Sequence, residues 1–282
     1  MVESALYVVS TPIGNLDDMT PRALQVLSGV DLIAAEDTRH SGRLLQHFSV
    51  ATRTMALHDH NERQVCDRLI ERLQSGESIA LISDAGTPLV NDPGYHLVYA
   101  AHQNRIKVIP VVGACAAIAA LSVSGLASDR FAYEGFLPAK AGARVHRLET
   151  LKDETRTLIF YEAPHRIIAS LESLVLVMGY ERTATFAREL TKRFESVRQA
   201  PLGELLEWVR SDPNQQKGEI VLVVQGAPDR GSEEGIDSEV RRILTLLLDD
   251  LPTKQAAALA AKITGLKKNI LYKEALQIVD KE

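Results

Sequence analysis

Short apolar runs alternate with amphipathic stretches along most of the chain, and this pattern predicts strands that alternate with helices. Parallel neighbouring strands need a crossover connection, which is usually a helix. The first part of the chain is therefore expected to form a doubly wound, largely parallel sheet. The expected elements are strands at 6–9, 31–35, 79–82 and 107–112, and helices at 22–28, 42–47, 61–74, from 95 onwards and from 113 onwards.

The pattern restarts near residue 128 and predicts a second, smaller α/β domain with a core of its own. Its apolar strands end in charged residues, as the first set does, and amphipathic stretches separate them. The expected elements are strands at 131–136, 157–161, 183–187 and 218–224, and helices at 167–178 and 202–209.

A third part follows residues 227–236, which are rich in Pro, Gly, Asp and Ser and are typical of a linker. The remaining pattern is helical, with Ser238 as a plausible cap of the first helix and Gly265 between the last two. Two short helices joined at a glycine match a helix-turn-helix outline. The sequence therefore predicts domains at 1–121, 122–228 and 236–282.

The helical tail carries a local basic patch, although the 282-residue chain as a whole has a net charge of −5. Two interpretations remain open: a solvated face on a dimerisation arm, or a contact with nucleic acid. The lysines of this patch are Lys254, Lys262, Lys267, Lys268 and Lys273.

Composition indicates an ordinary globular protein, with 45% hydrophobic and 24% charged residues. The two cysteines, Cys66 and Cys115, match no metal-binding or redox spacing, which favours a reducing compartment. The N-terminus lacks a cationic region and a long apolar stretch, so no signal peptide is expected. The Ala-rich run at 114–126 is too short to span a membrane. We expect a cytoplasmic protein.

The stretch Ser83–Pro88 follows a predicted buried strand and therefore lies at the carboxyl edge of the sheet, where open α/β sheets bind ligands. Small residues at 85 and 86 allow a ligand to approach the backbone. Similar small or polar strand ends occur at 11–15, 113–117 and 161–166. No phosphate-binding loop, zinc motif or nucleophile elbow occurs in the sequence. The pattern favours a large flat ligand that is bound across the carboxyl edges of two domains.

Several stretches together resemble the tetrapyrrole methylase superfamily, and most closely its ribosomal RNA branch, the small-subunit rRNA (cytidine) 2′-O-ribose methyltransferases. The resemblance implies two α/β domains with a cofactor cleft between them, S-adenosylmethionine as the cofactor, methylation of a ribose hydroxyl in small-subunit ribosomal RNA, and a homodimer. The stretches are 11–18, 36–39, 83–88, 92–94, 135–138, 161–166 and 188–192, in the order of the family and spread over nearly the whole chain.

The resemblance also implies cofactor contacts by position. In this interpretation Cys115 is part of a cavity wall and not a nucleophile. The expected cofactor-binding residues are Pro12, Ile13, Gly14, Asp84, Ala85, Gly86, Thr87, Gly113, Cys115, Ala116, Tyr161, Glu162 and Ala187.

A ribose hydroxyl is a weak nucleophile, so a base or a cation near its oxygen assists methyl transfer. The candidates are Glu189 and Lys192 from the second domain, with Glu36 and Arg39 from the first. For each of them an ordinary surface salt bridge is the alternative. Arginines that would grip RNA phosphates are Arg144, Arg147, Arg166, Arg188 and Arg193.

Two other functions remain open from the sequence. One is methylation of a small molecule such as a tetrapyrrole, against which the basic tail argues. The other is RNA binding without catalysis, through the helix-turn-helix, in which case S-adenosylmethionine would not bind.

Overall fold

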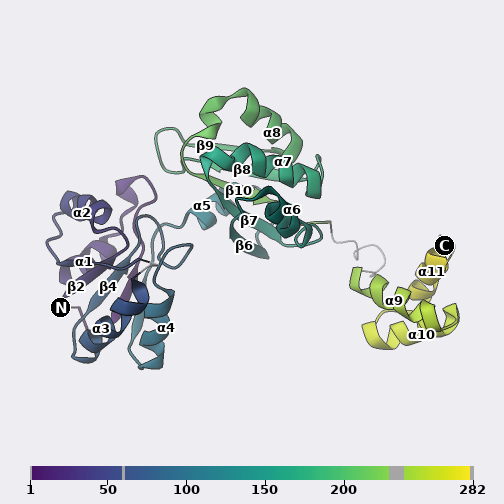
Figure 1. Cartoon of the computed structure of the whole chain (residues 1–282), viewed down its shortest axis with the longest axis horizontal. Coiled ribbons are helices and arrows are strands. Elements are labelled where there is room, and N and C mark those ends of the chain that lie inside the picture. The colour runs from purple at the N-terminus through teal and green to yellow at the C-terminus, as the bar shows by residue number, and fades with distance from the viewer. Residues whose placement is uncertain (1, 59–60, 229–237, 280–282) are drawn as a thin grey trace. The chain divides into compact units, whose positions relative to one another are not determined.

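The computed structural model describes residues 2–58, 61–228 and 238–279 (Figure 1). The chain divides into two compact units. Residues 1–152 and 156–225 form the first unit, which contains both β-sheets. Residues 153–155 and 226–282 form the second unit, which contains the last three helices.

The first sheet has the strand order β3-β2-β4-β1-β5, and every pair in it is parallel. All five strands therefore end at the same edge, which places their following loops together. Its elements are β1 (Leu6–Val9), the 3₁₀ helix Leu16–Asp18, α1 (Pro21–Gly29), β2 (Leu32–Ala35), α2 (Thr38–His47), β3 (Thr54–Ala56), α3 (Glu62–Gln74), β4 (Ile79–Ile82), α4 (Tyr95–Gln103) and β5 (Val108–Val111).

Both faces of this sheet are buried, which explains why its strands are continuous apolar runs. Alternate residues enter two different cores: Ala80 and Ile82 face α1, whereas Ile79 and Leu81 face α3 and α4. The sequence did not predict β3, a strand of three residues of which none is fully buried. So short a strand leaves almost no periodic signal.

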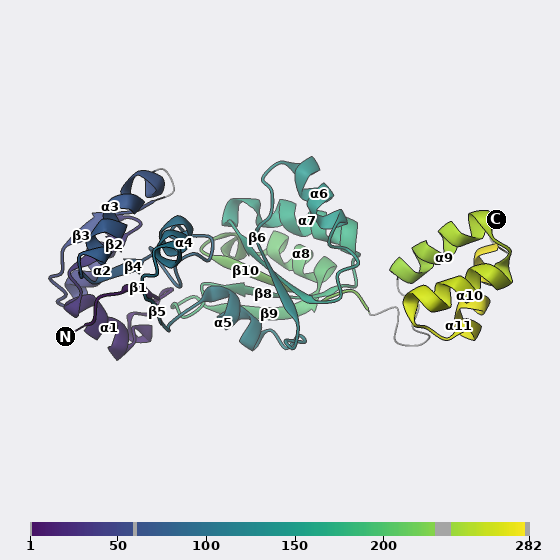
Figure 2. The ribbon, with the colours of Figure 1, turned by 90° about the horizontal axis from the view of Figure 1, so that it is seen from below.

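The second sheet has the order β6-β7-β10-β8-β9, with β6 parallel to β7 and the other pairs antiparallel. One face packs on α6, α7 and α8, and the other packs on α5 (Figure 2). Its elements are α5 (Ala116–Val123), β6 (Phe131–Phe136), α6 (Ala141–Glu149), β7 (Thr157–Glu162), the 3₁₀ helices Pro164–Arg166 and Pro213–Gln216, α7 (Ile167–Met178), β8 (Thr183–Arg188), β9 (Ser196–Pro201), α8 (Leu202–Ser211) and β10 (Ile220–Val224).

Two features of this part differ from the sequence prediction. The expected domain boundary after residue 121 falls inside α5, whose Ala117, Ala120 and Leu121 pack against the second sheet and not the first. Strand β9 was not predicted, because none of its residues is fully buried and its sequence at the edge of the sheet has no continuous apolar run. Pairing with β8, and not apolar periodicity, makes this segment a strand.

The second unit contains α9 (Ser238–Asp250), α10 (Thr253–Thr264) and α11 (Lys268–Val279) around a small apolar core. Gly265 ends α10 with a φ of 74°, a conformation that glycine adopts without strain. Most of the predicted linker lies outside the described residues, as does the proposed capping side chain of Ser238. In the part of the chain that the structure describes, no helix has the length and apolarity to cross a membrane.

Candidate active site

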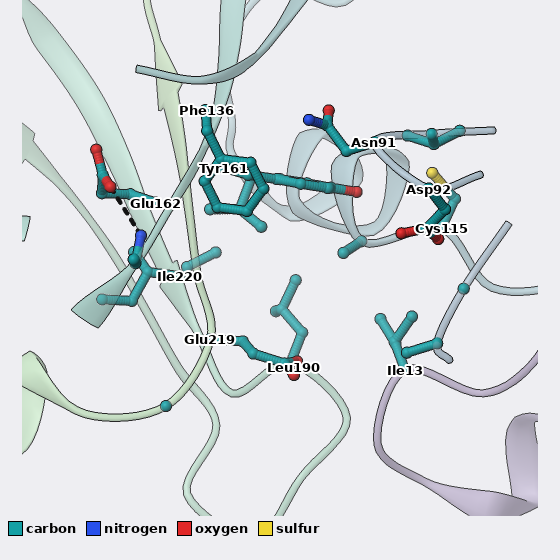
Figure 3. A pocket seen from close by; sticks show the side chains of 18 of the residues that line it. Ile13, Asn91, Asp92, Cys115, Phe136, Tyr161, Glu162, Leu190, Glu219 and Ile220 are labelled. Carbon is teal, nitrogen blue, oxygen red and sulfur yellow. Dashed lines mark hydrogen bonds between the residues drawn. The ribbon is translucent and has the colours of Figure 1, made fainter. Parts of the chain in front are cut away.

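A cavity of about 380 Å³ lies between the strand-end loops of the first sheet and the second sheet, within the first unit (Figure 3). Its volume lies in the range of roughly 300–1,000 Å³ that is typical of small-molecule sites. Figure 3 shows Ile13 and Asp92 on the side of the first domain, and Tyr161 and Leu190 on the side of the second.

Hydrogen bonds hold three loops of the first domain together beside the cavity. Thr11 and Gly86 exchange two backbone hydrogen bonds, of 2.8 and 3.0 Å. The hydroxyl of Thr87 donates to the carbonyl of Ala114 at 2.9 Å, so the 2.9 Å contact with Ser10 is donated by the serine. Gly86 has a φ of 80°, and a Cβ there would lie 3.3 Å from Cγ2 of Ile13. These loops therefore form a rigid cradle with little room for larger residues.

Nine of the thirteen expected cofactor residues line the cavity. The other four, Pro12, Gly14, Asp84 and Gly113, do not. The nine are Ile13, Ala85, Gly86, Thr87, Cys115, Ala116, Tyr161, Glu162 and Ala187.

Asp84 forms hydrogen bonds with the loop after β2 and is not among the residues that line the cavity. Its carboxylate accepts a hydrogen bond from the amide of Asp37 at 3.2 Å, and its own amide donates to Glu36 at 3.3 Å. This pairing joins the ends of β2 and β4. The cavity carboxylate of the first domain is instead that of Asp92.

Arg39 also lies away from the lining residues. Its side chain is 90% exposed and makes a 2.9 Å ion pair with Asp37. The hydrogen bonds from this guanidinium hold the pKa of Asp37 far below its usual range. Both of the candidates from the first domain, Glu36 and Arg39, are therefore engaged at the start of α2.

Aromatic rings form the second-domain wall of the cavity. Tyr161 makes edge-to-face contacts with Tyr133 and with Phe136, with ring centroids 5.1 and 5.7 Å apart. Its hydroxyl accepts a hydrogen bond from the amide of Ala117 at 3.1 Å. Burial raises the pKa of Tyr161 to about 12, so the phenol is neutral at physiological pH.

Glu162 lines the cavity, but its carboxylate is committed to the protein. The side chain is 1% exposed and accepts hydrogen bonds from the amide of Ala163 at 2.8 Å and from Nε of Arg166 at 3.2 Å. The hydroxyl of Ser170 donates to the second oxygen. Glu162 therefore fixes the strand end that bears Ala163 and Pro164, and Figure 3 shows its carboxylate directed away from Tyr161.

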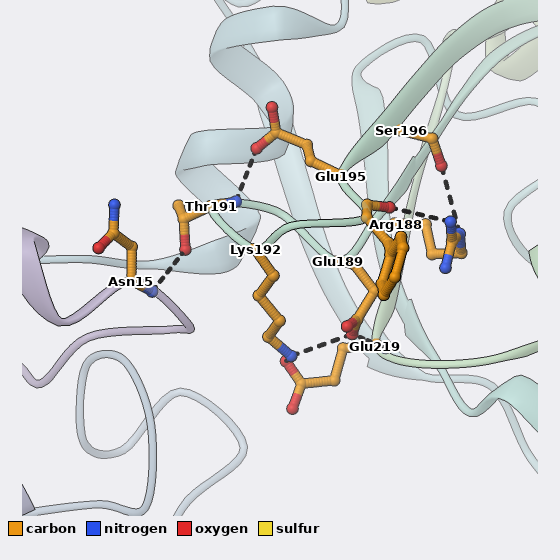
Figure 4. Close-up of polar contacts among 9 residues, drawn as sticks. Asn15, Arg188, Glu189, Thr191, Lys192, Glu195, Ser196 and Glu219 are labelled. Atoms are coloured by element: carbon orange, nitrogen blue, oxygen red, sulfur yellow. Dashed lines mark hydrogen bonds and ion pairs between the residues drawn. The ribbon is translucent and has the colours of Figure 1, made fainter.

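Glu189 and Lys192, the two candidates from the second domain, form an ion pair just after β8, and Glu219 also contacts Lys192 (Figure 4). Nζ of Lys192 is 3.0 Å from Glu189 and 2.9 Å from Glu219. Although burial opposes both charges, hydrogen bonds from the Glu219 amide and from Lys192 hold the pKa of Glu189 below its usual value. The two carboxylates likewise raise the pKa of Lys192. Glu189 and Lys192 are therefore both charged at neutral pH.

The loop that carries this cluster is strained and is held in place from both sides. Glu189 and Thr191 have φ values of 51° and 67°, which are uncommon for residues other than glycine. The amide of Asn15 donates to Oγ1 of Thr191 at 3.1 Å, which ties the loop to the first domain (Figure 4). The buried guanidinium of Arg188 holds the other end through the carbonyl of Phe194 at 2.9 Å.

Most of the arginines expected to grip phosphates are engaged elsewhere. Arg144 and Arg188 are buried and hydrogen bonded within the protein. Arg147 pairs with Glu134 and Arg166 with Glu162. Of the five, Arg193 alone is exposed without an ion pair among the described residues, beside the ring of Phe194.

Sequence reasoning missed a further group of cavity residues. Asp92 and Phe136 stand in stretches that were quoted only for the resemblance, without a role for either residue. Nothing in the sequence marks Glu219, because it reaches the cavity through the pairing of β10 with β8. The missed lining residues are Val90, Asn91, Asp92, Phe136, Ala163, Pro164, Leu190, Gly218, Glu219, Ile220 and Val221.

A family model described as tetrapyrrole (corrin/porphyrin) methylases matches residues 5–206, which include both sheets except β10. The chain belongs to this family. A second model, the RsmI C-terminal HTH domain, matches residues 234–278.

Curated relatives match over nearly the whole length of the chain. Ribosomal RNA small subunit methyltransferase I of Pseudomonas aeruginosa is 59% identical over 98% of both chains. The proteins of the same name from Escherichia coli O157:H7 and Vibrio cholerae are 57% and 56% identical, over 98% and 96% of this chain and 96% and 94% of theirs. The chain therefore also belongs to the group of these methyltransferases.

Solved structures share the fold at low sequence identity. The methyltransferase CobJ has a TM-score of 0.58 at 18% identity, over 79% of this chain and 94% of its own. A uroporphyrin-III C-methyltransferase from Thermus thermophilus, complexed with S-adenyl homocysteine, has a TM-score of 0.54 at 15% identity, over 78% and 97%. The expected fold, the methyltransferase activity and the cofactor S-adenosylmethionine are thus confirmed.

The cavity residues fit this cofactor chemically. Apolar and aromatic side chains, among them Phe136, Tyr161 and Leu190, suit the flat adenine ring. The carboxylates of Asp92 and Glu219 suit hydroxyl and ammonium donors. Gly86 lines the cavity with a φ of 80°, a conformation that residues with a side chain rarely adopt.

Proposed function

We propose that this enzyme transfers a methyl group from S-adenosylmethionine to the ribose 2′-hydroxyl of a cytidine in small-subunit ribosomal RNA. The observation that carries the proposal is the cavity between the two α/β domains, in a chain that matches rRNA small subunit methyltransferases along nearly its whole length. The resemblance found in the sequence supports the ribose and the cytidine, which the names of these relatives do not specify.

When bound, S-adenosylmethionine supplies an electrophilic methyl carbon, which forms a bond to the acceptor oxygen as its bond to sulfur breaks. The protein has to hold the acceptor in line and exclude water. Orientation of this kind is worth on the order of 7–11 kcal/mol at best. The hydrogen-bonded loops around Gly86 and the aromatic wall around Tyr161 provide the rigid surroundings that such alignment needs.

Glu189 and Lys192 remain our candidates for the residues next to the acceptor hydroxyl. Lys192 is protonated at neutral pH and therefore stabilises negative charge on the oxygen and does not act as a base. Glu189 is ionised and accepts the hydrogen bond, and then the proton, of the hydroxyl. Glu219 links this pair to the cavity, since it both lines the cavity and contacts Lys192.

The first-domain candidates take indirect roles in this proposal. Glu36 acts as a positioning residue through Asp84, and the exposed pair of Arg39 and Asp37 stabilises the start of α2. The remaining predicted cofactor residues, Pro12, Gly14 and Gly113, stand in the loops after β1 and β5 and do not line the cavity.

We further propose that the enzyme works as a homodimer in the cytoplasm. Exposed apolar side chains on the first unit support an assembly: Tyr95 and Tyr99, which stack on each other, are 62% and 55% exposed, and Val112 is 75% exposed. Analytical ultracentrifugation of the full chain tests the dimer, and a sedimentation coefficient of a monomer at micromolar concentration would contradict it.

The reaction is tested by transfer of labelled methyl groups to small ribosomal subunits from cells that lack this protein. Naked rRNA and a tetrapyrrole precursor serve as parallel acceptors. We expect label in the rRNA, at a single cytidine and in a linkage that resists alkali, because a 2′-O-methyl group blocks strand cleavage. Label in the base, or only in the tetrapyrrole, would overturn the proposed acceptor.

A further inference from the structure

The surface formed by α10, the turn after it and α11 carries a set of lysines that form no ion pair among the described residues. We propose that this lysine surface binds the phosphate backbone of structured ribosomal RNA and anchors the enzyme to its substrate. The proposal goes beyond the methyl-transfer reaction, because it concerns a separate unit of the chain that contains none of the cavity residues. The lysine surface consists of Lys254, Lys262, Lys267, Lys268 and Lys273.

All five lysines are exposed, and none makes an ion pair within residues 238–279 as the structure describes them. Helix α9 differs, since its Arg242 is paired with Glu239 three residues earlier at 2.7 Å. The one acidic residue between 251 and 279 is Glu274, which is buried and paired with Arg241 of α9. Residues 251–279 therefore present five exposed cations and no exposed anion.

A solvated helix face carries charges of both signs, which support each other at spacings of three or four residues. The lysine surface lacks this arrangement. Lys267 and Lys268 also stand at the beginning of α11, where the helix dipole disfavours positive charge. Lysines at these positions do not stabilise the helix, and this favours the interpretation that they bind an external polyanion.

The exposed face of α11 adds groups that suit RNA. Asn269 and Tyr272 are exposed beside Lys268 and Lys273, at the four-residue spacing that places side chains on one side of a helix. Tyr272 is 39% exposed and presents an aromatic ring and a hydroxyl. Three residues, including Gly265, separate α10 from α11, as in a helix-turn-helix.

Four of the five arginines considered above as phosphate contacts in the first unit are paired or buried. With a chain charge of −5, local contacts and not an overall positive field must attract RNA. Phosphate contacts position an RNA without reading its sequence. The lysine surface is thus expected to supply affinity, while the cavity selects the reacting nucleotide.

The test uses the full-length protein with the substitutions Lys267→Gln, Lys268→Gln and Lys273→Gln combined. Binding to a small-subunit rRNA fragment is measured by fluorescence anisotropy between 50 and 200 mM salt, without cofactor. The slope of log affinity against log salt changes by roughly 0.7–0.9 for each phosphate group that the protein ceases to neutralise. We expect a slope shallower by about 2 and at least tenfold weaker binding at about 150 mM salt.

A matched control combines Arg63→Gln, Arg68→Gln and Arg105→Gln, which removes three exposed cations of the first unit that have no ion pair among the described residues. The control is expected to bind rRNA like the parent protein. An unchanged slope in the lysine variant, or an equal loss in the control, would overturn the proposal.

Two further measurements separate this inference from the proposed function. The lysine variant is expected to keep its affinity for S-adenosylmethionine and its kcat on saturating subunits, with only KM raised. Weaker binding to assembled subunits but not to naked rRNA would show a protein partner and contradict an RNA surface. If RNA binding depends on these lysines, the inference is supported even when the methyl-transfer assay shows that the RNA is not the acceptor.

Discussion

Asn15 and Thr191 are 176 residues apart in the sequence and are joined by a 3.1 Å hydrogen bond from the amide of Asn15 to Oγ1 of Thr191. The bond connects the first strand-end loop of one α/β domain with the loop that carries Glu189 and Lys192 in the other. The position of the proposed catalytic pair thus depends on a contact between the two domains.

The first prediction concerns this contact. Thr191→Val removes the acceptor but keeps the shape of the side chain, and a typical hydrogen bond contributes about 0.5–1.5 kcal/mol. We expect kcat/KM for methyl transfer to fall about 2- to 12-fold. Thr191→Ser, which retains the hydroxyl, serves as the control, and equal losses in both variants would contradict this role.

The second prediction concerns Gly14, which lies beneath the side chain of Lys192. A Cβ at Gly14 would lie 2.9 Å from Cε of Lys192 and closer still to its Cγ, so Gly14→Ala displaces the lysine. We expect a loss of methyl transfer with unchanged affinity for S-adenosylmethionine in calorimetry.

Gly42→Ala is the matched control for Gly14→Ala. Gly42 lies within α2, and a Cβ there meets nothing within 4 Å. Alanine favours a helix over glycine by up to about 1 kcal/mol, so this variant is expected to melt at a higher temperature with full activity. Full activity in Gly14→Ala as well would contradict the proposed role of Lys192.

The third prediction compares two carboxylates. Asp92 lines the cavity, whereas Asp84 holds the amide of Asp37 at the end of β2. A hydrogen bond to a charged group contributes about 1.5–3 kcal/mol, so Asp92→Ala is expected to weaken binding of S-adenosylmethionine about 10- to 150-fold. Asp84→Ala is expected to lower the melting temperature and to change the affinity less than about threefold. Equal losses of affinity would place Asp84 at the cofactor after all.

The fourth prediction concerns the pH dependence of stability. The pKa of Glu189 is lowered, so its contribution is present above its unfolded pKa of about 4.3 and is lost as the pH falls through the lower folded value. The pKa of Lys192 is raised, so its contribution is present below about pH 10.4 and is lost as the pH rises through the higher folded value.

Lys192→Met removes these interactions. The difference in melting temperature between parent and variant is therefore expected to be largest between about pH 5 and pH 10 and to shrink outside this window. Lys107→Met is the control, since Lys107 and Glu3 are both 59% exposed and such pairs contribute little. A difference that does not vary with pH would contradict the coupling between Glu189 and Lys192.

The sequence by itself determined the elements with a strong periodic or capping signal. The strands at 6–9 and 79–82 and the helix at 167–178 have the predicted bounds, because continuous burial and helical periodicity are local properties of the chain. Thr20 caps α1 by accepting a hydrogen bond from the amide of Ala23 at 3.1 Å, and Pro21 occupies the first helical position, so the start of this helix is a local property of the sequence. The strand-end loops at Ile13, Gly86 and Cys115 were likewise placed at one edge of a sheet from the sequence, and all three residues line the cavity.

Only the tertiary structure decided which polar groups line the cavity and which form hydrogen bonds within the protein. Asp84 and Asp92 are both carboxylates of one turn-rich segment, and hydrogen bonding to the end of β2 separates their roles. Glu219 joins Glu189 and Lys192 through the antiparallel pairing of β10 with β8, a contact between segments about thirty residues apart. Periodicity indicates which face of a helix or strand is buried. It does not indicate which side chains contact each other, because those contacts depend on the pairing of strands that are distant in the sequence.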